Sequence, residues 1–358
     1  MIVRELKLKL TVKQENILNE WLWILTGVYN WGSRKIKLDA KDSIYYSQFD
    51  FMNILKGHYK KIGVPSQTVQ AILNQSWDAW DKCFKKIRKG EPKLKSIRNK
   101  LKSLPFPAPI KEKHFSLDDK KIQLPIIGKL RFHKNEIPEG KIKRSRIVKR
   151  ASGWYIQLTI DSKHSFQVKK NGKIVGIDTG FKDLAILSDG KKYENPRYYI
   201  KGQKRLAKAQ RGKNKKLVAR LHERMANRRK DYNHKVSREI VINNKEIYIT
   251  NDNLRGQSKI FGKSVSDAGI SQLRNFIIYK GDNHNRKVKL VESKHTTMTC
   301  SNCGALTGPT GLNGLAVRYW ECSACRAYHD RDINSAKVIL NIGVGLTLES
   351  NAKEKSYA

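Results

Sequence analysis

Two C-x-x-C pairs near the C-terminal end constrain the fold more than any other feature of this sequence. The pairs are Cys300–Cys303 and Cys322–Cys325, and the 18 residues 304–321 separate them. This spacing is typical of four thiolates that bind one zinc ion tetrahedrally, with the intervening residues forming a hairpin. A closed four-cysteine site leaves no open coordination position. We therefore expect a structural zinc ion and a zinc ribbon over residues 296–329.

The charge of the chain indicates its partner class. The 358 residues include 73 Lys+Arg and 32 Asp+Glu, a net charge of +41. Such a chain repels itself unless a polyanion is present, and counterion release rewards many Lys/Arg–phosphate contacts. A membrane surface is the alternative polyanion, but membranes usually recruit a local basic cluster, and here the charge extends along almost the whole chain. Nucleic acid is therefore the expected partner.

The remaining composition bounds size and location. With 39% hydrophobic residues the chain can bury real cores, and its length predicts two or three domains. No apolar run approaches the ~18 residues of a membrane-spanning helix, and the N-terminal residues lack the apolar core of a signal peptide. We expect an intracellular, cytoplasmic protein without a membrane partner. Cys83, in an apolar helical stripe, is interpreted as a core residue.

The first half of the chain contains a helical segment between β-type segments. Residues 2–10 alternate as a strand, and Thr11 with Gln14 predicts a capping box that opens a helix. A second helical stripe follows Pro65, so residues 11–104 are predicted to be a helical domain. Residues 1–10 and 105–170 are predicted to form a β-rich domain with one basic face.

The second half alternates strands and basic helices. We predict two buried strands over 173–188, a long basic helix over 201–230, a strand at 247–249, a helix near 266–280 and a strand at 287–292. A last helix begins near Asp332, and residues 345–358 are a polar tail. The basic side chains that we expect to contact phosphates as a group are Lys143, Arg144, Arg146, Arg211, Arg224, Arg228, Arg229 and Lys230.

Two carboxylates occupy positions suited to metal binding. Asp178 ends a buried strand inside G-I-D-T-G, and Asp332 opens the last helix, where the alternative role is an N-terminal cap. Phosphodiester cleavage by two metal ions normally needs three or more carboxylates around Mg2+. The third is expected at the end of the strand that covers residues 247–250.

The order of these motifs resembles the TnpB (OrfB) proteins of bacterial insertion sequences, relatives of type V CRISPR effectors. The similarity covers about residues 1–342 and rests on several segments. These are LKLTVKQENIL, IQLPIIGKLRF with PEGKIKRSRIVKRASGWYIQLTI, VGIDTGFKDLAILSDGKKYENPR, LVARLHERMANRRKDYNHKVSREIV, ESKHTTMTCSNCG and YHDRDINSAKVIL.

The resemblance implies an α+β multidomain fold. It comprises a helical recognition domain, a β-barrel wedge-like domain and an RNase H-like (RuvC) α/β domain with an inserted zinc ribbon. The RuvC-like domain would cover 171–295 and 330–344. Asp178 matches the first catalytic carboxylate and Asp332 the third, with Asp330 the less favoured candidate.

The middle motif departs from the family pattern of an apolar strand followed by E-D-L-N. Here the text is EIYITNDNLRG, and aligning its strand and its closing Arg255-Gly256 puts Asn251 where the Glu belongs. Asn binds Mg2+ far less well than a carboxylate. Asp252 is a possible substitute only if the strand register slips by one residue, which would reverse its face.

The resemblance and the altered middle motif together imply an RNA-guided DNA-binding protein whose nuclease is lost or severely weakened, acting as a repressor like the TnpB-like nuclease-dead repressors (TldR). The partners implied are a guide RNA and a double-stranded DNA target with a short flanking motif, with structural zinc. The alternative is an active endonuclease of a transposable element, using Asp178, Asp252 and Asp332 with Mg2+. A further alternative is an unguided zinc-ribbon nucleic-acid binder.

Overall fold

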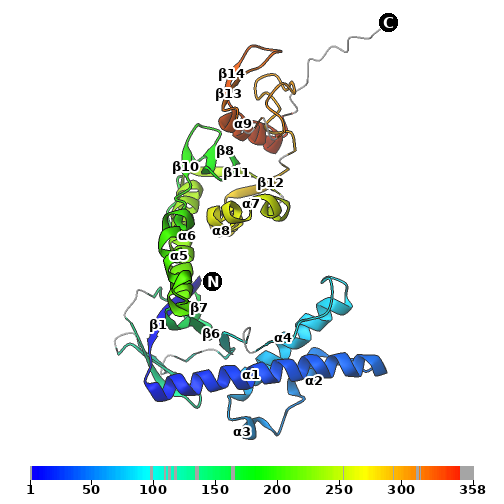
Figure 1. Ribbon diagram of the computed structural model, residues 1–358, viewed down its shortest axis with the longest axis vertical. Helices are drawn as coiled ribbons and strands as arrows, with labels where there is room; N and C mark the ends of the chain where they lie inside the picture. Colours follow the sequence, from blue (N-terminus) through cyan, green and yellow to red (C-terminus); the bar gives the residue numbers. More distant parts are fainter. Residues whose placement is uncertain are drawn as a thin grey trace. The chain divides into compact units, whose positions relative to one another are not determined.

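The computed structural model of the chain divides into two compact units, Met1–His164 and Ser165–Ala358 (Figure 1). Each unit has its own hydrophobic core and is described separately. The predicted tail falls mainly outside the described residues, which end at 346. The residues that the structure describes are 2–96, 100–108, 110–111, 114–116, 119–133, 137–162, 166–252, 254–292, 294–311, 314 and 316–346.

The helical part of the first unit begins at the predicted capping box. The Thr11 hydroxyl accepts the Gln14 N–H, and the Gln14 side chain accepts the Thr11 N–H. The apolar stripes of α1 and α4 pack against each other, as the helical spacing predicts. The helices are α1 (Val12–Asp39), the 3-10 turn η1 (Ala40–Asp42), α2 (Gln48–Asn53), α3 (Tyr59–Ile62) and α4 (Ser66–Phe84).

The β part of the first unit is one seven-stranded sheet in the order β2-β6-β7-β1-β5-β4-β3. Strand β1 links two halves, because residues 2–7 pair with β7 and residues 8–9 pair with β5. The sheet was predicted to close into a barrel, but no pairing between β2 and β3 joins its two ends within the described ranges. The strands are β1 (Ile2–Lys9), β2 (Ser103–Phe106), β3 (Phe115–Ser116), β4 (Lys121–Leu124), β5 (Gly128–Phe132), β6 (Lys141–Arg150) and β7 (Gly153–Asp161).

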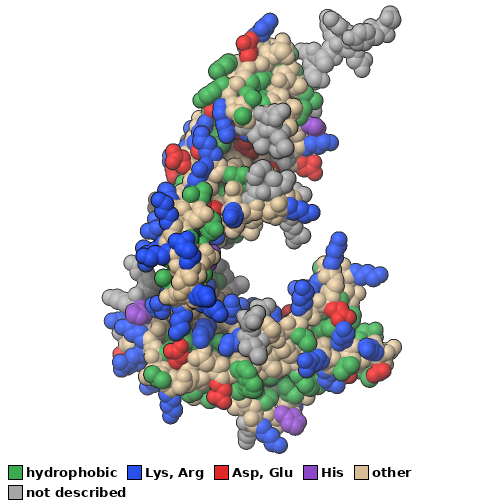
Figure 2. Space-filling view, in the orientation of Figure 1, with side chains coloured by type: hydrophobic (Ala, Val, Ile, Leu, Met, Phe, Trp, Pro, Cys, Tyr) green, Lys and Arg blue, Asp and Glu red, His purple; other side chains and the backbone are tan. Residues whose placement is uncertain are grey.

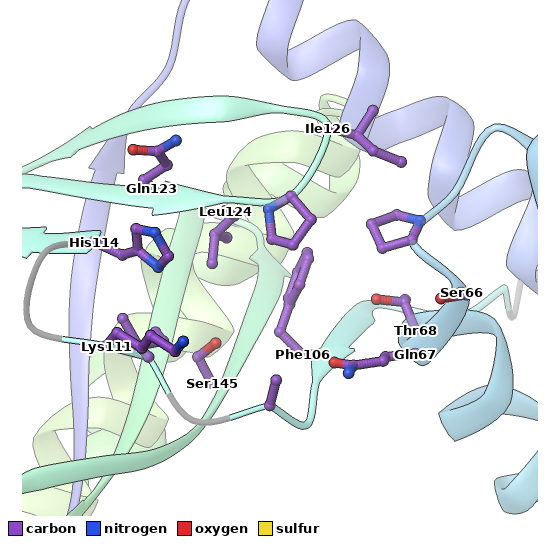
Figure 3. A pocket seen from close by; sticks show the side chains of 14 residues that line it. Ser66, Gln67, Thr68, Phe106, Lys111, His114, Gln123, Leu124, Ile126 and Ser145 are labelled. Carbon is purple, nitrogen blue, oxygen red and sulfur yellow. The ribbon is translucent and has the colours of Figure 1, made fainter.

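Helices and sheet of the first unit share one core. Leu22 and Leu73 from the helices belong to the same buried cluster as Leu104 and Ile156 from the strands. A pocket of about 490 Å³ opens between the start of α4 and the β4–β5 hairpin, with Phe106 in its wall (Figure 3). The helical and β segments that the sequence distinguishes therefore pack as one body.

The second unit is built on a five-stranded mixed sheet in the order β10-β9-β8-β11-β12. The three strands β8, β11 and β12 are parallel, and β9 and β10 extend the sheet as antiparallel hairpins. Buried residues of α6 and α8 cover one face of this sheet. The strands are β8 (Lys173–Asp178), β9 (Asp183–Leu187), β10 (Lys192–Glu194), β11 (Asn244–Thr250) and β12 (Lys287–Val291).

Helix α9 covers the opposite face at very short range. A Cβ on Gly176 would lie 2.1 Å from the Ala336 carbonyl oxygen, and one on Gly343 would lie 2.2 Å from the Tyr248 ring. Both glycines are therefore required by the close approach of α9 to the sheet. The remaining elements are α5 (Tyr198–Arg211), α6 (Lys215–Asn243), α7 (Leu254–Ala268), α8 (Ile270–Asn283), β13 (Tyr319–Glu321), β14 (Tyr328–Asp330) and α9 (Arg331–Val344).

Two predicted helices differ in the structure. The basic helix expected over 201–230 is two helices, because the chain turns at Lys213 (φ +50°) and Asn214 then caps α6 by accepting the Leu217 N–H. The helix expected near 266–280 spans the end of α7 and most of α8, which Gly269 (φ +66°) separates. Among the helices that the structure describes, none is both long and apolar enough to cross a membrane.

Candidate active site and cysteine cluster

The ends of two parallel strands bring the acidic residues of the second unit together. Tyr248 of β11 lies beside Gly176 of β8, and Ile249 lies beside Ile177, so the next residues, Thr250 and Asp178, are neighbours. Side chains alternate between the faces of a strand. Since Gly176 contacts α9, Asp178 points to the α9 side of the sheet.

One pocket of about 790 Å³ at this edge of the sheet is lined by five carboxylates. Two of them are Asp183 and Asp267, and the other three are the candidates Asp178, Asp252 and Asp332. They come from the end of β8, the segment after β11 and the first turn of α9. The basic side chains that line the same pocket are Lys182, Arg197, Lys263, Arg318 and Arg331. Acidic and basic groups therefore share a cavity large enough for part of a nucleic-acid strand.

The charges of Asp252 and Asp332 act electrostatically on Asp178. The pKa of Asp178 is raised to about 8, mainly by burial and also by the negative charges of Asp252 and Asp332. A hydrogen bond from the Thr179 N–H and the charge of Arg331 oppose this rise without cancelling it. Asp178 is half-buried, and a carboxyl group so placed beside two other carboxylates holds its proton unless a cation compensates the charge.

Two hydroxyl groups hold Asp252 in the pocket. Its Oδ2 accepts a hydrogen bond from Thr179 Oγ1 at 2.9 Å and another from Thr250 Oγ1 at 3.1 Å. Thr250 precedes Asp252 by two residues, and Thr179 follows Asp178 directly. These bonds join the Asp252 segment to the ends of both β8 and β11.

Asn251 does not take the place that the sequence alignment predicted. Its N–H donates to the Val291 carbonyl at 2.8 Å, which continues the β11–β12 ladder one residue beyond Thr250. Its side-chain oxygen accepts from Arg274 Nη1 of α8 at 3.2 Å. Asn251 therefore lies on the α8 side, and Asp252, one position on, reaches the pocket without any register slip.

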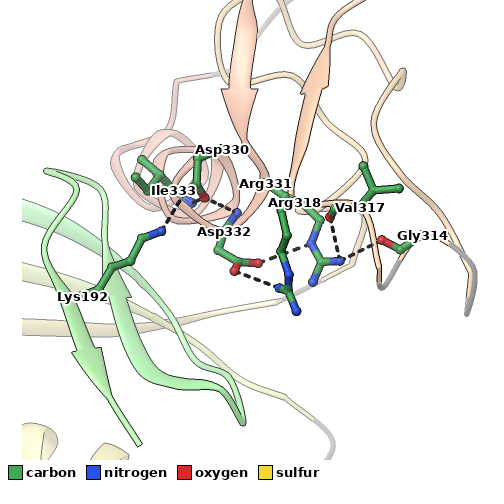
Figure 4. Close-up of polar contacts among 8 residues, drawn as sticks. All are labelled: Lys192, Gly314, Val317, Arg318, Asp330, Arg331, Asp332 and Ile333. Atoms are coloured by element: carbon green, nitrogen blue, oxygen red, sulfur yellow. Dashed lines mark hydrogen bonds and ion pairs between the residues drawn. The ribbon is translucent and has the colours of Figure 1, made fainter.

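Asp330 and Asp332 at the start of α9 have different roles (Figure 4). Asp330 is the helix cap, because its Oδ1 accepts the N–H groups of Asp332 and Ile333 at 3.0 and 3.1 Å. Burial would raise the pKa of Asp330, but the Lys192 ammonium, 2.7 Å away, and the capping N–H groups hold it below its usual value. The alternative role considered for Asp332, that of the cap, thus belongs to Asp330.

The Asp332 carboxylate is left to face cationic side chains of the pocket. Arg318 Nη1 and Arg331 Nε each lie 3.3 Å from one of its oxygens. Arg331 also donates to the Gly314 carbonyl at 2.8 Å, which ties the start of α9 to the segment before β13. Figure 4 shows this network around Asp332.

The oxygen ligands that the carboxylate pocket offers suit a hard divalent cation. Carboxylate oxygens are the protein ligands that Mg2+ prefers, and the raised pKa of Asp178 marks negative charge that a cation would neutralise. The carboxylate oxygens do not converge as closely as the cysteine sulfurs do. Within the described part of the chain, only the four cysteines bring three or more ligand atoms within 4.8 Å of one another.

The cysteine cluster has the arrangement that the spacing predicts. Cys300 Sγ lies 3.7 Å from Cys325 Sγ, and Cys303 Sγ lies 3.6 Å from Cys322 Sγ. The two pairs sit in matching turns: the N–H of residue 304 donates to the carbonyl of 300, and that of 326 to that of 322. Four thiol groups at this spacing fit a tetrahedral metal ion such as zinc.

The surroundings divide the cysteines: the pKa values of Cys322 and Cys325 are lowered, which favours their thiolates, whereas those of Cys300 and Cys303 are raised. Burial would raise the pKa of Cys322, but hydrogen bonds from the Thr307 hydroxyl and from backbone N–H groups lower it to about 6. His329 is buried against Trp320, and its Nε2 lies 3.0 Å from Cys300 Sγ. His329 thus contacts the Cys300 sulfur from outside the group of four sulfurs.

The predicted phosphate-binding side chains lie on two separate surfaces, one in each unit. On β6 of the first unit, Arg144 and Arg146 are exposed, and Lys143 pairs with Asp161 at 3.3 Å. The members in the second unit are Arg211, at the end of α5, and Arg224, Arg228, Arg229 and Lys230 on α6. Figure 2 shows Lys and Arg side chains gathered over α5 and α6.

Two members of this set also make contacts within the second unit. Arg228 lies over the Tyr198 ring at 5.9 Å, and the Arg229 chain packs beside Gly269. Arg211, Arg224 and Lys230 are exposed. The α6 surface is therefore partly fixed by internal packing and partly open to a ligand.

Sequence reasoning missed several residues of the pocket. Thr179, Thr250 and Arg318 contact the carboxylates, but none of them belongs to a residue type or spacing that predicts such a contact. Asp267 also lines the pocket and accepts the Tyr199 N–H at 2.8 Å, capping α5 from another helix. The one signal in the sequence was that Thr179 directly follows Asp178 in the G-I-D-T-G motif, which places it near the pocket.

Comparison with known proteins gives matches along most of the chain. A family model for the OrfB_IS605 group, described as "Probable transposase", matches residues 157–260, and the model "Cas12f1-like, TNB domain" matches residues 271–339. A cryo-EM structure of a Cas12f1–sgRNA–target DNA complex aligns over 95% of this chain and 99% of that chain, with 16% identity and a TM-score of 0.41.

Curated relatives give the same assignment. A putative RNA-guided DNA endonuclease of Streptomyces pristinaespiralis is 33% identical over 226 residues, which are 58% of this chain and 55% of the relative. The putative RNA-guided DNA endonuclease InsQ of Escherichia coli K12 is 28% identical over 308 residues, 78% of this chain and 75% of InsQ. The chain thus spans about half the length of the first relative. Together with the two family models, these matches show that the chain belongs to the TnpB (OrfB) family.

Proposed function

We propose that this protein is an RNA-guided DNA endonuclease that cleaves with Asp178, Asp252 and Asp332. The observation that carries the proposal is the position of Asp252, which lines the same pocket as the other two carboxylates. The negative charge of Asp252 contributes to the raised pKa of Asp178, which supports a shared role of the two groups at one cation. The names of the Streptomyces and Escherichia coli relatives support the same activity.

The residues of the pocket would divide the work of phosphodiester hydrolysis. When bound, Mg2+ would activate the attacking water and stabilise the charge that develops on the phosphate. Asp178, Asp252 and Asp332 would hold it, and Asp178 would first lose its proton. Arg318 pairs with Asp332 in the free protein, and a bound DNA phosphate would compete for this arginine.

In this proposal the rest of the chain binds the guide and the target. Residues 11–104 would act as the recognition domain, 1–10 and 105–170 as the wedge-like domain, and 171–295 with 330–344 as the RuvC-like domain. The predicted basic side chains of β6 and α6 would bind the phosphates of a guide RNA and of its heteroduplex with DNA. The sugar–phosphate backbone of nucleic acids supplies most of the binding affinity in such complexes. Zinc in the ribbon would be structural.

A second candidate function is a guide-directed repressor that binds DNA without cutting it. Two observations favour it. Arg318 and Arg331 already form ion pairs with the Asp332 carboxylate. The three carboxylates also do not converge into a compact set of ligand atoms as the cysteine sulfurs do, within the described residues. The argument from Asn251, on which this function first rested, is weakened because Asn251 faces α8. An unguided zinc-ribbon binder would not need the carboxylate pocket at all.

The test is cleavage and binding measured on the same complex. RNA that co-purifies with the chain is sequenced, and its guide segment is used to design a target duplex with a randomised flank. With Mg2+ the wild-type complex should cut this duplex, whereas Asp178→Asn and Asp332→Asn should bind it equally well and leave it intact. Binding without cutting by the wild type would support the repressor, and binding that needs no RNA would support the unguided protein.

A further inference from the structure

We propose that the hydroxyl groups of Thr179 and Thr250 are positioning residues that orient the Asp252 carboxylate toward a divalent cation. This inference rests on the proposed function of the carboxylate pocket. Neither threonine lies at a position that the family resemblance marks as functional. Both contact the one carboxylate that the sequence alignment left in doubt.

The three side chains form a closed triangle. Thr179 Oγ1 and Thr250 Oγ1 lie 2.9 and 3.1 Å from Asp252 Oδ2, and the two hydroxyl oxygens lie 3.1 Å from each other. Each hydroxyl carries a single proton, so two protons serve three contacts. Hydrogen bonds to a charged acceptor are the stronger ones, which favours both threonines donating to the ionised Asp252.

The threonines belong to the framework of the sheet. Thr250 is the last residue of β11 and is 1% exposed, and Thr179 directly follows β8. A β-branched side chain has few χ1 states, and burial restricts it further. The two hydroxyls therefore provide fixed donors, one at the end of each strand, and Asp252 is held by both.

Asp252 needs such donors because neither regular secondary structure nor a favourable charge holds its carboxylate beside Asp178. It follows the end of β11, outside any regular element, and its negative charge repels that of ionised Asp178. Without the hydroxyls, the Asp252 carboxylate would turn away from Asp178 and the cation would lose a ligand.

The test compares removal of the hydroxyls with their retention. Thr179→Val with Thr250→Val keeps the side-chain shape and removes both donors, and Thr179→Ser with Thr250→Ser keeps both donors. Mn2+ binding to the zinc-loaded full-length protein is titrated by electron paramagnetic resonance, with Asp178→Asn as the blank for other sites. Loss of supporting groups around a metal ligand typically costs about 10–100-fold in affinity, so the double valine variant should lose about that much.

The outcomes distinguish this inference from the proposed function. The double serine variant should lose far less than about 10-fold in Mn2+ affinity, since its donors remain. If the double valine variant also binds as the wild type does, while Asp252→Asn binds poorly, the threonines do not position Asp252 and the proposed function stands. If wild type and Asp178→Asn bind equally, the pocket holds no cation and both proposals fail.

A folding defect would not hide the result. Thr179 is partly exposed, whereas Thr250 is buried, so the single variant Thr179→Val is carried in parallel, with thermal unfolding of every protein. A purely structural role would lower the unfolding temperature and leave the Mn2+ affinity of the folded protein unchanged. Weaker Mn2+ binding by folded Thr179→Val, restored in Thr179→Ser, supports the positioning role.

Discussion

The protonation of Asp178 makes the stability of the second unit depend on pH in an unusual direction. In the unfolded chain this carboxyl group has its ordinary pKa of 3.8, and in the native state the pKa is about 8. Between these values the native state keeps a proton that the unfolded state has released. Stability therefore falls as the pH rises through this window, and above about pH 8 the loss is complete.

The magnitude follows from the size of the shift. About four pH units separate the two pKa values, and each unit corresponds to about 1.4 kcal/mol. The wild-type second unit should therefore lose on the order of 5 kcal/mol between pH 4 and 8 through this one group. Asp178→Asn removes the titrating group, so its stability should lack this slope, which is about 1.4 kcal/mol per unit near pH 6.

The assay is hydrogen exchange of peptides from β8 and β11 at several pH values, with zinc present and no Mg2+. Exchange rates corrected for intrinsic pH dependence give the opening free energy of the second unit alone. The matched control Asp231→Asn removes an exposed carboxylate of α6 and reports general charge effects. Equal slopes for wild type and Asp178→Asn would refute the assignment of the buried proton to Asp178.

Three further predictions concern packing, charge and metal. Gly176→Ala should destabilise the second unit by about 3 kcal/mol or more in thermal unfolding, because the new Cβ would meet the backbone of α9, whereas Gly262→Ala has open space and should be neutral or mildly stabilising. Lys280 is buried with its pKa lowered to about 8. Lys280→Met removes this desolvated charge but also two hydrogen bonds, to the His234 carbonyl and the Ser237 hydroxyl, so it should raise stability at pH 7 by about 1 kcal/mol. Wild-type stability should itself rise from pH 8 to 10.5, as the native lysine loses its proton before the unfolded one does. Metal analysis should find one zinc per chain, lost in Cys322→Ser and retained in Cys83→Ser.

Local spacing made much of this structure predictable from the sequence. The capping box at Thr11 and the paired cysteines are contacts between residues close in the chain, and both are formed as expected. Asp178 and Asp332 stand out as candidates because each sits at the end of a recognisable element, and the structure places both in one pocket. Such signals need no knowledge of how distant segments pack.

The errors arose where the outcome depends on the exact end of an element. The alignment could not show that β11 keeps its pairing through Asn251, and this one extra residue decides which side chain faces Asp178. The basic helix breaks at Gly212-Lys213-Asn214, where Gly212 caps α5 and Asn214 caps α6; this stop and start signal lies inside a continuous run of basic residues. Thr179 contacts Asp252, 73 positions away, and Arg318 contacts Asp332, 14 positions away. Contacts between such distant residues can be identified only once the fold is known.

The most direct test of the central claim is guide-dependent DNA cleavage in Mg2+ by two neighbouring variants, Asp252→Asn and Asn251→Ala. Asp252 lines the carboxylate pocket, whereas Asn251 contacts Arg274 on the other side of the sheet. We predict that Asp252→Asn abolishes cutting and keeps target binding, and that Asn251→Ala cuts at a rate close to that of the wild type. Cutting by Asp252→Asn at the wild-type rate, or no cutting by the wild type itself, would contradict the account.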